Sequence, residues 1–118
     1  MAAPASAEVP IKDVPNVQLP VVQKWAMKYA PALVPLALTE VKGKPAGYRS
    51  VYLAGAVLGY VDYEFCYAVQ FRPSWFKTKA KATFSQHDLA QLSVIGISAD
   101  SFFPPFDKGV MLGCTFFR

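Results

Sequence analysis

The stretch from Val51 to Phe71, VYLAGAVLGYVDYEFCYAVQF, constrains the fold of this chain more than any other feature. Most of its residues are apolar, and an arginine stands on each side of it, Arg49 before and Arg72 after. A helix needs about 20 apolar residues, each rising about 1.5 Å, to cross the hydrocarbon core of a bilayer. The stretch therefore predicts one transmembrane helix within residues 47–72.

Two acidic residues, Asp62 and Glu64, lie inside this stretch. On insertion scales, each costs about 2.5–3.5 kcal/mol at the centre of an isolated membrane helix. Residues two apart point to nearly opposite sides of a helix, so the two acids cannot share one partner. We expect Glu64, Arg49 and Arg72 to contact charged groups of a partner subunit or the lipid headgroup layer.

Small residues recur along one side of the same stretch. Gly55 and Gly59 form a GxxxG motif, and Asp62 and Cys66 continue that side over the next two turns. Small residues at this spacing allow a second helix to approach closely. We therefore predict that these four residues face a neighbouring transmembrane helix.

Aromatic residues gather toward the end of the stretch and in an earlier segment. Tyrosine and tryptophan favour the membrane interface, where the ring and its polar group find different surroundings. The residues that we assign to this interface are Trp25, Tyr29, Tyr60, Tyr63, Tyr67 and Trp75.

A second interpretation of the stretch is a strand. From Val61 to Phe71, large apolar residues alternate with polar ones, as in a half-buried strand. Further strands near residues 92–97 and 110–117 would complete a soluble, β-rich interaction module. The segment 53–58 shows no such alternation and contains glycine and alanine, which are poor strand formers. The pattern favours the helix and leaves the strand open.

The remaining chain divides by composition into three parts. Prolines at positions 4, 10, 15 and 20 predict an extended arm over residues 1–20, since proline fixes its own dihedral and lacks a donor. Residues 21–46 hold an amphipathic pattern and predict a membrane-surface segment with a short helix. A short helix that covers a soluble core would show the same pattern. Residues 73–118 predict an irregular C-terminal extension packed on partners, with one short helix between Ser85 and Leu92. The expected fold class is mainly α.

The chemistry-bearing residues are few. Cys66 and Cys114 show no metal-ligand spacing, so we expect no metal site and favour buried reduced thiols over a disulfide. His87 stands without a nucleophile or paired acid, so we predict neither catalysis nor a cofactor. The net charge is +4, and the lysines at 77, 79 and 81 suit anionic lipid headgroups. They match no nucleic-acid-binding fold, so we expect no nucleic-acid partner.

One family resemblance emerges from the order of these motifs. The order is GKPAGY, then AGAVLGY, then VDYEFCY, then Phe71 and Arg72. It resembles subunit f of the mitochondrial ATP synthase membrane sector, over about a quarter of the chain. The matching positions are Gly43, Lys44, Pro45, Gly59, Tyr60, Glu64 and Phe65. This chain differs in continuing from Arg72 to Arg118, where such proteins usually end soon after the helix.

The resemblance implies a function without catalysis. Proteins of that family have a segment along the matrix side and one transmembrane helix, and they help to organise the peripheral stalk and the dimer-forming region. It implies a single-pass accessory subunit of the mitochondrial inner membrane that supports proton-driven ATP synthesis. Its partners would be other subunits and membrane lipid, with no small-molecule substrate. The alternatives are an accessory subunit of a respiratory chain complex and the soluble β-rich module.

Overall fold

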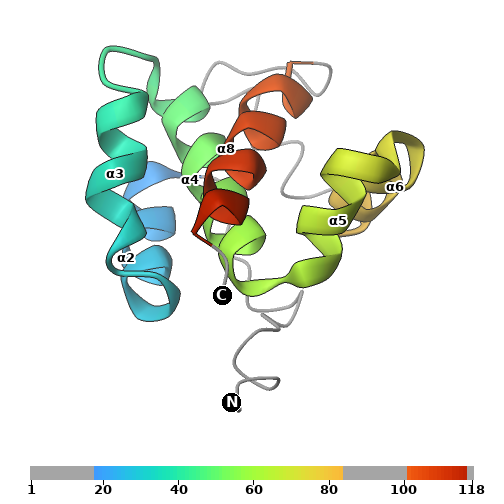
Figure 1. The fold of residues 1–118 in the computed structure, drawn as a ribbon. Coiled ribbons are helices and arrows are strands. Elements are labelled where there is room, and N and C mark those ends of the chain that lie inside the picture. The colour runs from blue at the N-terminus through green and yellow to red at the C-terminus, as the bar shows by residue number, and fades with distance from the viewer. Residues whose placement is uncertain (1–17, 84–100, 117–118) are drawn as a thin grey trace.

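The computed structural model describes residues 18–83 and 101–116, and these residues are mainly helical, as predicted. No strand occurs within these two ranges. Figure 1 shows α4 and α8 side by side in the middle, with α2 and α3 on one side and α5 and α6 on the other. The helices are α2 (Leu19–Tyr29), α3 (Leu33–Glu40), α4 (Ala46–Val61), α5 (Tyr63–Phe71), α6 (Pro73–Thr83) and α8 (Phe103–Thr115).

Helix α4 is the centre of the fold. Twelve of its 16 residues are buried, and the exceptions are Ala46, Tyr48, Arg49 and Tyr60. A helix that is apolar on all sides must be covered on all sides, by protein or by lipid. In this chain α2, α3, α5 and α8 all pack against it.

Helices α2 and α3 cover one side of α4. Pro20 lies in the first turn of α2, where its missing N–H costs no helical hydrogen bond. Helix α2 begins at Leu19, so residues 19 and 20 of the predicted arm are helical, and the rest of the arm, residues 1–17, lies outside the described residues. The predicted segment 21–46 holds most of α2 and all of α3, followed by a turn at Gly43, where φ is +88°. Glycine adopts this left-handed conformation without a steric penalty.

The structure does not support the predicted single transmembrane helix over residues 47–72, because the chain breaks at Asp62 into α4 and α5. Asp62 has an extended backbone (φ −123°, ψ 104°), and its side chain accepts a hydrogen bond of 2.9 Å from the Glu64 N–H. This is the N-cap interaction that starts a new helix. Of the helices in the described ranges, none combines the length and the hydropathy needed to cross a membrane.

The described part of the C-terminal extension is helical, and the prediction of an irregular segment is wrong there. Pro104 and Pro105 lie in the first turn of α8, where proline is tolerated, so they start this helix instead of breaking it. The short helix expected between Ser85 and Leu92 lies outside the described residues.

The strand interpretation is wrong wherever the structure describes the residues concerned. Residues 63–71 form α5, and residues 110–115 belong to α8. The third strand, expected near residues 92–97, lies outside the described ranges. Alternation between Val61 and Phe71 misleads because the acids at 62 and 64 occupy the first turn of a helix and its cap.

A cluster of phenylalanines joins α5 and α6 to α8. The Phe65 ring lies edge-on to Phe76 at 6.1 Å and to Phe106 at 5.7 Å between ring centroids. Phe106 also stacks on Phe102 at 5.1 Å and on Phe76 at 5.6 Å. All four side chains are buried, so α5 and α6 share one hydrophobic core with α8.

Candidate functional site

The closest helix contact in the molecule is made by four glycines of α4 and α8. Gly55 and Gly59 of α4 face Gly109 and Gly113 of α8. A Cβ added to Gly55 would lie 2.6 Å from the carbonyl oxygen of Phe106, and one added to Gly59 would overlap the carbonyl of Val110. Since these neighbours are backbone atoms, only glycine permits this approach.

The predicted helix contact of Gly55 and Gly59 is therefore made within the chain. Helix α8 covers the face that we assigned to a neighbouring transmembrane helix. The two residues predicted to continue that face do not do so as expected. Asp62 caps α5, where the chain changes direction, whereas Cys66 lies in α5 and still contacts α8, through Cys114.

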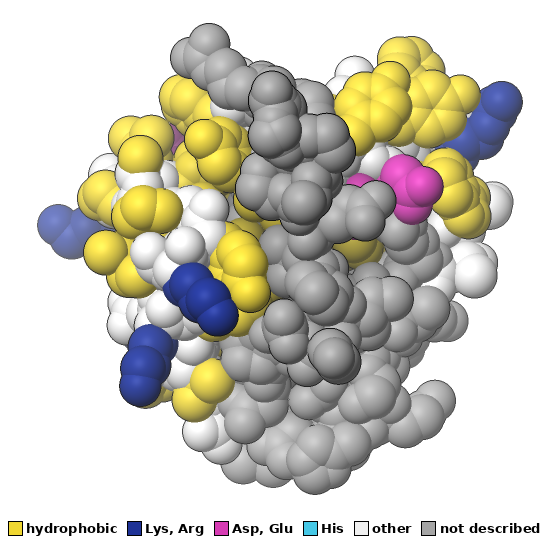
Figure 2. Space-filling view, turned by 90° about the horizontal axis from the view of Figure 1, so that it is seen from below, with side chains coloured by type: hydrophobic (Ala, Val, Ile, Leu, Met, Phe, Trp, Pro, Cys, Tyr) yellow, Lys and Arg dark blue, Asp and Glu magenta, His cyan; other side chains and the backbone are white. Residues whose placement is uncertain are grey.

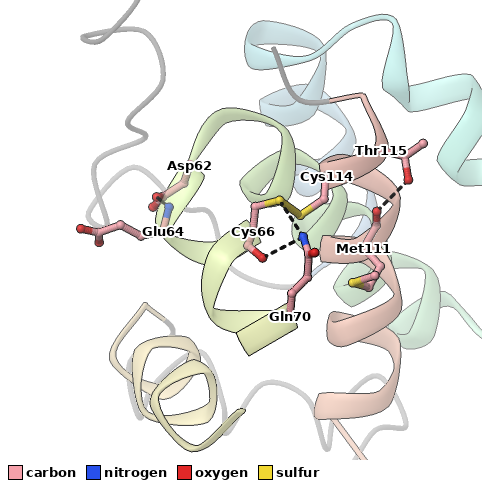
Figure 3. Close-up of a disulfide and its surroundings, with 7 residues drawn as sticks. All are labelled: Asp62, Glu64, Cys66, Gln70, Met111, Cys114 and Thr115. Atoms are coloured by element: carbon pink, nitrogen blue, oxygen red, sulfur yellow. Dashed lines mark hydrogen bonds between the residues drawn. A yellow bond between two sulfur atoms is a disulfide. The ribbon is translucent and has the colours of Figure 1, made fainter. Parts of the chain in front are cut away.

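Cys66 and Cys114 form a disulfide that joins α5 to the end of α8 (Figure 3). Their Cα atoms lie 5.5 Å apart, within the usual range for disulfides. The Gln70 side-chain amide donates to the Cys66 carbonyl oxygen at 3.3 Å and to its Sγ at 3.4 Å. The prediction of reduced thiols is wrong, because sequence spacing alone does not reveal that the fold brings two cysteines together.

Helices α5 and α6 carry a row of partly exposed aromatic side chains, which we call the aromatic ridge: Tyr63, Tyr67, Phe71 and Trp75. Ring centroids lie 6.3 Å apart between Tyr63 and Tyr67 and 5.3 Å apart between Tyr67 and Phe71. In Figure 2, hydrophobic side chains gather on the side of these two helices, next to basic and acidic side chains. Three of the six residues that we assigned to a membrane interface belong to this ridge.

The other three residues assigned to that interface lie elsewhere. Trp25 is buried, with 8% of its surface exposed, and its ring centroid is 5.7 Å from that of Tyr29. Tyr29 and Tyr60 line a groove of about 310 Å³ with Leu36 and Phe116. This groove is mainly apolar and lies between the turn from α2 to α3 and the end of α8.

The charged residues that we assigned to partner contacts have different surroundings. Glu64 and Arg72 are exposed at the two ends of α5, and an Arg72 guanidinium N–H donates to the Phe71 carbonyl oxygen at 3.5 Å. Arg49 is half-buried in α4, and its Nε makes no hydrogen bond. Sequence reasoning grouped the three, but the fold does not bring them together at one site.

A second pocket, of about 330 Å³, is polar. Its lining residues are Glu40, Val41, Lys44, Tyr48, Tyr52 and Lys108. Burial raises the pKa of Tyr52 above its ordinary value, and the negative charge of Glu40 adds to the effect. The Lys44 Nζ lies 5.2 Å from the Tyr48 ring centroid, in a cation–π contact. The pocket is lined by one carboxylate and two amines, so its formal charge is +1.

Lys77 of α6 and Asp107 of α8 are close enough to interact electrostatically. Burial raises the pKa of Asp107, and the positive charge of Lys77 partly offsets that rise. The Asp107 Oδ1 is buried without a hydrogen bond, while the Lys77 Nζ lies 5.6 Å from the Phe103 ring centroid. The packing of α8 thus keeps the Asp107 carboxyl partly buried, where its charged form is unfavourable.

The sequence interpretation missed the role of Gly109 and Gly113. They form a GxxxG motif with the same spacing as Gly55 and Gly59, and this repeated spacing was the available signal. Among the residues that the structure describes, no group of three or more histidine, cysteine or acidic side chains is placed to bind a metal. The distinctive features are therefore a tight glycine contact, a disulfide and the aromatic ridge.

Comparison with known proteins adds no relative. No protein-family model matches the chain, and no curated protein or solved structure is similar to it at a significant level.

Proposed function

We propose that this chain is a non-catalytic accessory subunit of a mitochondrial inner-membrane complex, and that the complex is the membrane sector of the ATP synthase. The proposal begins from the resemblance of GKPAGY, AGAVLGY and VDYEFCY to subunit f. One structural observation supports it most. The AGAVLGY stretch forms a helix that is apolar on all sides and carries a glycine face.

The turn before this helix is consistent with the resemblance. Gly43 has a positive φ with open space around it, so its conformation, and not crowding, calls for glycine. Pro45 then stands as the N-cap of α4, immediately before its first residue. The GKP motif thus marks the start of the central helix.

Assembly with a complex is tested by tagging the full chain in its native mitochondria. After extraction in mild detergent, we expect the chain to migrate with the ATP synthase on native gels and to co-purify with subunits of its membrane sector. Migration with a respiratory chain complex would support that alternative instead. Migration of the chain alone would contradict both.

Glu64 provides a variant for this assay, with Glu40 as the matched control. Both carboxylates are exposed, but only Glu64 lies in the stretch that resembles subunit f. If Glu64 pairs with a basic side chain of a partner, Glu64→Gln leaves that partner charge unmatched and lowers recovery of the complex. Glu40→Gln should leave recovery unchanged. Equal recovery of both variants would assign Glu64 to solvent or headgroups.

The transmembrane part of the proposal concerns residues 47–72. A crossing like that of subunit f requires an arrangement different from the one described above, in which α4 and α5 form one helix through Asp62 and lipid or partner helices replace α8 around it. Alkaline carbonate extraction of the mitochondrial membranes tests this arrangement. Retention of the chain in the membrane pellet is the expected result. Release without detergent would contradict the crossing and leave attachment through protein contacts alone.

A further inference from the structure

The aromatic ridge exposes large apolar side chains at the surface of α5 and α6. Phe71 is 60% exposed and Trp75 is 43% exposed, and Tyr63 at the other end is 60% exposed. Single exposed apolar side chains are common on proteins and need no explanation. A row of aromatic side chains is different, because contiguous apolar patches mark interaction sites.

The spacing of the ridge makes it continuous. Its members are four residues apart, so Tyr63, Tyr67 and Phe71 follow one side of α5. Their ring contacts, at 6.3 Å and 5.3 Å between centroids, align the three side chains. Trp75 follows the break at Arg72 and lies in the first turn of α6, close to Phe71 along the chain but outside this helical row.

Charge is distributed unevenly along the ridge. Residues 65–83 include four basic residues, Arg72, Lys77, Lys79 and Lys81, and no acidic residue. The side chains of Arg72 and Lys77 are exposed, and Lys77 also lies near Phe103 and the Asp107 carboxylate of α8. The side chains of Lys79 and Lys81 lie outside the described part of the structure. The acids Asp62 and Glu64 lie at the opposite end, in the cap and first turn of α5. The end of the ridge with Phe71 and Trp75 is therefore basic.

We propose that this end of the aromatic ridge, Phe71 and Trp75 with Arg72 and Lys77, docks on the surface of an anionic phospholipid membrane. Aromatic rings favour the interfacial layer of a bilayer, and basic side chains near an anionic surface add electrostatic attraction. The inference rests on the folded arrangement of α5 and α6 and not on the proposed crossing through residues 47–72, and it holds whichever complex the chain joins.

The charges also argue against a second copy of the chain as the occupant. A symmetric dimer places the same patch of both copies face to face. Two copies joined through this end would bring the Arg72 and Lys77 of one near those of the other, and like charges repel. An anionic lipid surface satisfies the same charges.

The two tryptophans of the chain give a direct measurement. Trp25 is 8% exposed and Trp75 is 43% exposed, so a Trp25→Phe variant leaves the ridge tryptophan as the single fluorophore. We expect a blue shift of Trp75 emission when the purified, oxidised full chain meets vesicles of phosphatidylcholine with phosphatidylserine. Vesicles of phosphatidylcholine alone should give little shift, and added salt should reduce the shift with the anionic vesicles.

Vesicle flotation with matched variants tests the residues. Trp75→Ser and Phe71→Ser should each weaken binding about tenfold, while Met27→Ser, at a side chain 54% exposed on α2, should not. Arg72→Gln should weaken binding about fivefold. Lys24→Gln makes the same charge change on α2 and should have little effect. Circular dichroism verifies that each variant keeps its helices. The measurement of Trp75 emission uses an unaltered ridge, so it does not depend on the folding of any ridge variant.

Several results would overturn the inference. Equal binding to neutral and anionic vesicles would refute the role of the basic residues, and an unshifted Trp75 spectrum would refute insertion of the ridge. If the ridge variants instead abolish self-association in lipid-free buffer, the surface pairs two copies. If the α2 control variants lose as much binding as the ridge variants, the contact is not specific to the ridge.

Discussion

The pair α4–α8 and the unit formed by α5 and α6 are both apolar, but they use their apolar residues differently. At the contact of α4 with α8, the side chains are absent, and four glycines bring the two backbones together. On α5 and α6, the rings of the aromatic ridge are too large for such an approach and remain partly exposed. Glycines therefore allow two helices to pack through their backbones, whereas aromatic residues pack through their rings, as Phe65 and Phe76 do, or remain partly exposed.

The two regions also differ in what holds them to the rest of the chain. The α4–α8 pair is held by close backbone packing along both helices. The α5–α6 unit is held by the buried phenylalanine cluster and by one disulfide. The predictions below separate these contributions.

The largest effect is expected at the glycine contact. Gly59→Leu would force a side chain into the backbone of Val110, so the two helices must separate. We expect the free energy of unfolding to fall by about 4 kcal/mol, at the upper end for overpacking. Thermal or urea unfolding followed by circular dichroism measures this loss.

Ala32→Leu is the control for that substitution, since Ala32 is exposed. It adds the same leucine side chain without a backbone clash and should change stability by about 0.5 kcal/mol or less. A Gly59→Leu protein as stable as the Ala32→Leu protein would show that α4 and α8 do not pack closely in solution.

The disulfide comes next. Cys66 and Cys114 are separated by 48 positions, and closing a loop of this length restricts the unfolded chain. Replacing both by serine should lower the free energy of unfolding by about 3–4 kcal/mol. Hydrogen exchange should then rise more in α5 and α6 than in α4. A uniform rise over all helices would indicate that the two regions unfold together.

The cap at Asp62 should have a smaller effect. Asp62→Ala removes the acceptor for the Glu64 N–H and should destabilise α5 by about 1 kcal/mol. Asp62→Asn keeps an oxygen at that position and should recover most of the loss. Unfolding curves of the two variants decide this, and equal stability of both would contradict the cap.

The smallest effect concerns Asp107, between the two regions. Its pKa is raised in the folded chain by burial, so the folded state binds the proton more tightly than the unfolded state. The Asp107 carboxyl therefore contributes most to stability at pH values below its pKa in the unfolded chain. This contribution is lost as the pH rises through its higher pKa in the folded chain. Asp107→Asn should remove this decline and raise stability near neutral pH by about 0.5 kcal/mol or less.

Lys77 provides the control for that measurement. Its positive charge lowers the pKa of Asp107, so Lys77→Gln should move the decline to higher pH and make it larger. Stability measured against pH for both variants tests the sign. A pH profile unchanged by Asp107→Asn would show that this carboxyl has the same pKa in both states.

The sequence predicted the helical class and the short helix in residues 21–46, because apolar spacing and proline positions report local structure. It did not predict the break at Asp62, since an acid in a long apolar run was taken as a costly interruption of one helix. The N–H of Glu64 makes it a cap instead. Local composition did not distinguish these two roles.

The candidate site was less predictable, because its parts come from distant segments. The spacing of Gly55 and Gly59 indicated a close helix contact. The spacing does not distinguish a helix of a partner from α8 of the same chain. The pairing of Cys66 with Cys114 depends on how α5 and α8 pack, which no local pattern contains. Three ridge residues, Tyr63, Tyr67 and Trp75, were assigned to a membrane interface, which stays a prediction. Trp25, Tyr29 and Tyr60 were grouped with them although they lie elsewhere.

The bond between Cys66 and Cys114 also determines which products a single cleavage of the backbone gives. The residues between the two cysteines form a covalent ring with that bond, and the ring includes all of α6 and most of α8. A protease that cleaves once inside the ring opens it but leaves both pieces attached, whereas a cut before Cys66 releases a fragment. A chain cleaved once inside the ring would run as one band of unchanged mass on a gel without a reductant. On a gel with a reductant it would separate into two bands. The position of a cut can thus be assigned to the ring or to the N-terminal part from a pair of gels.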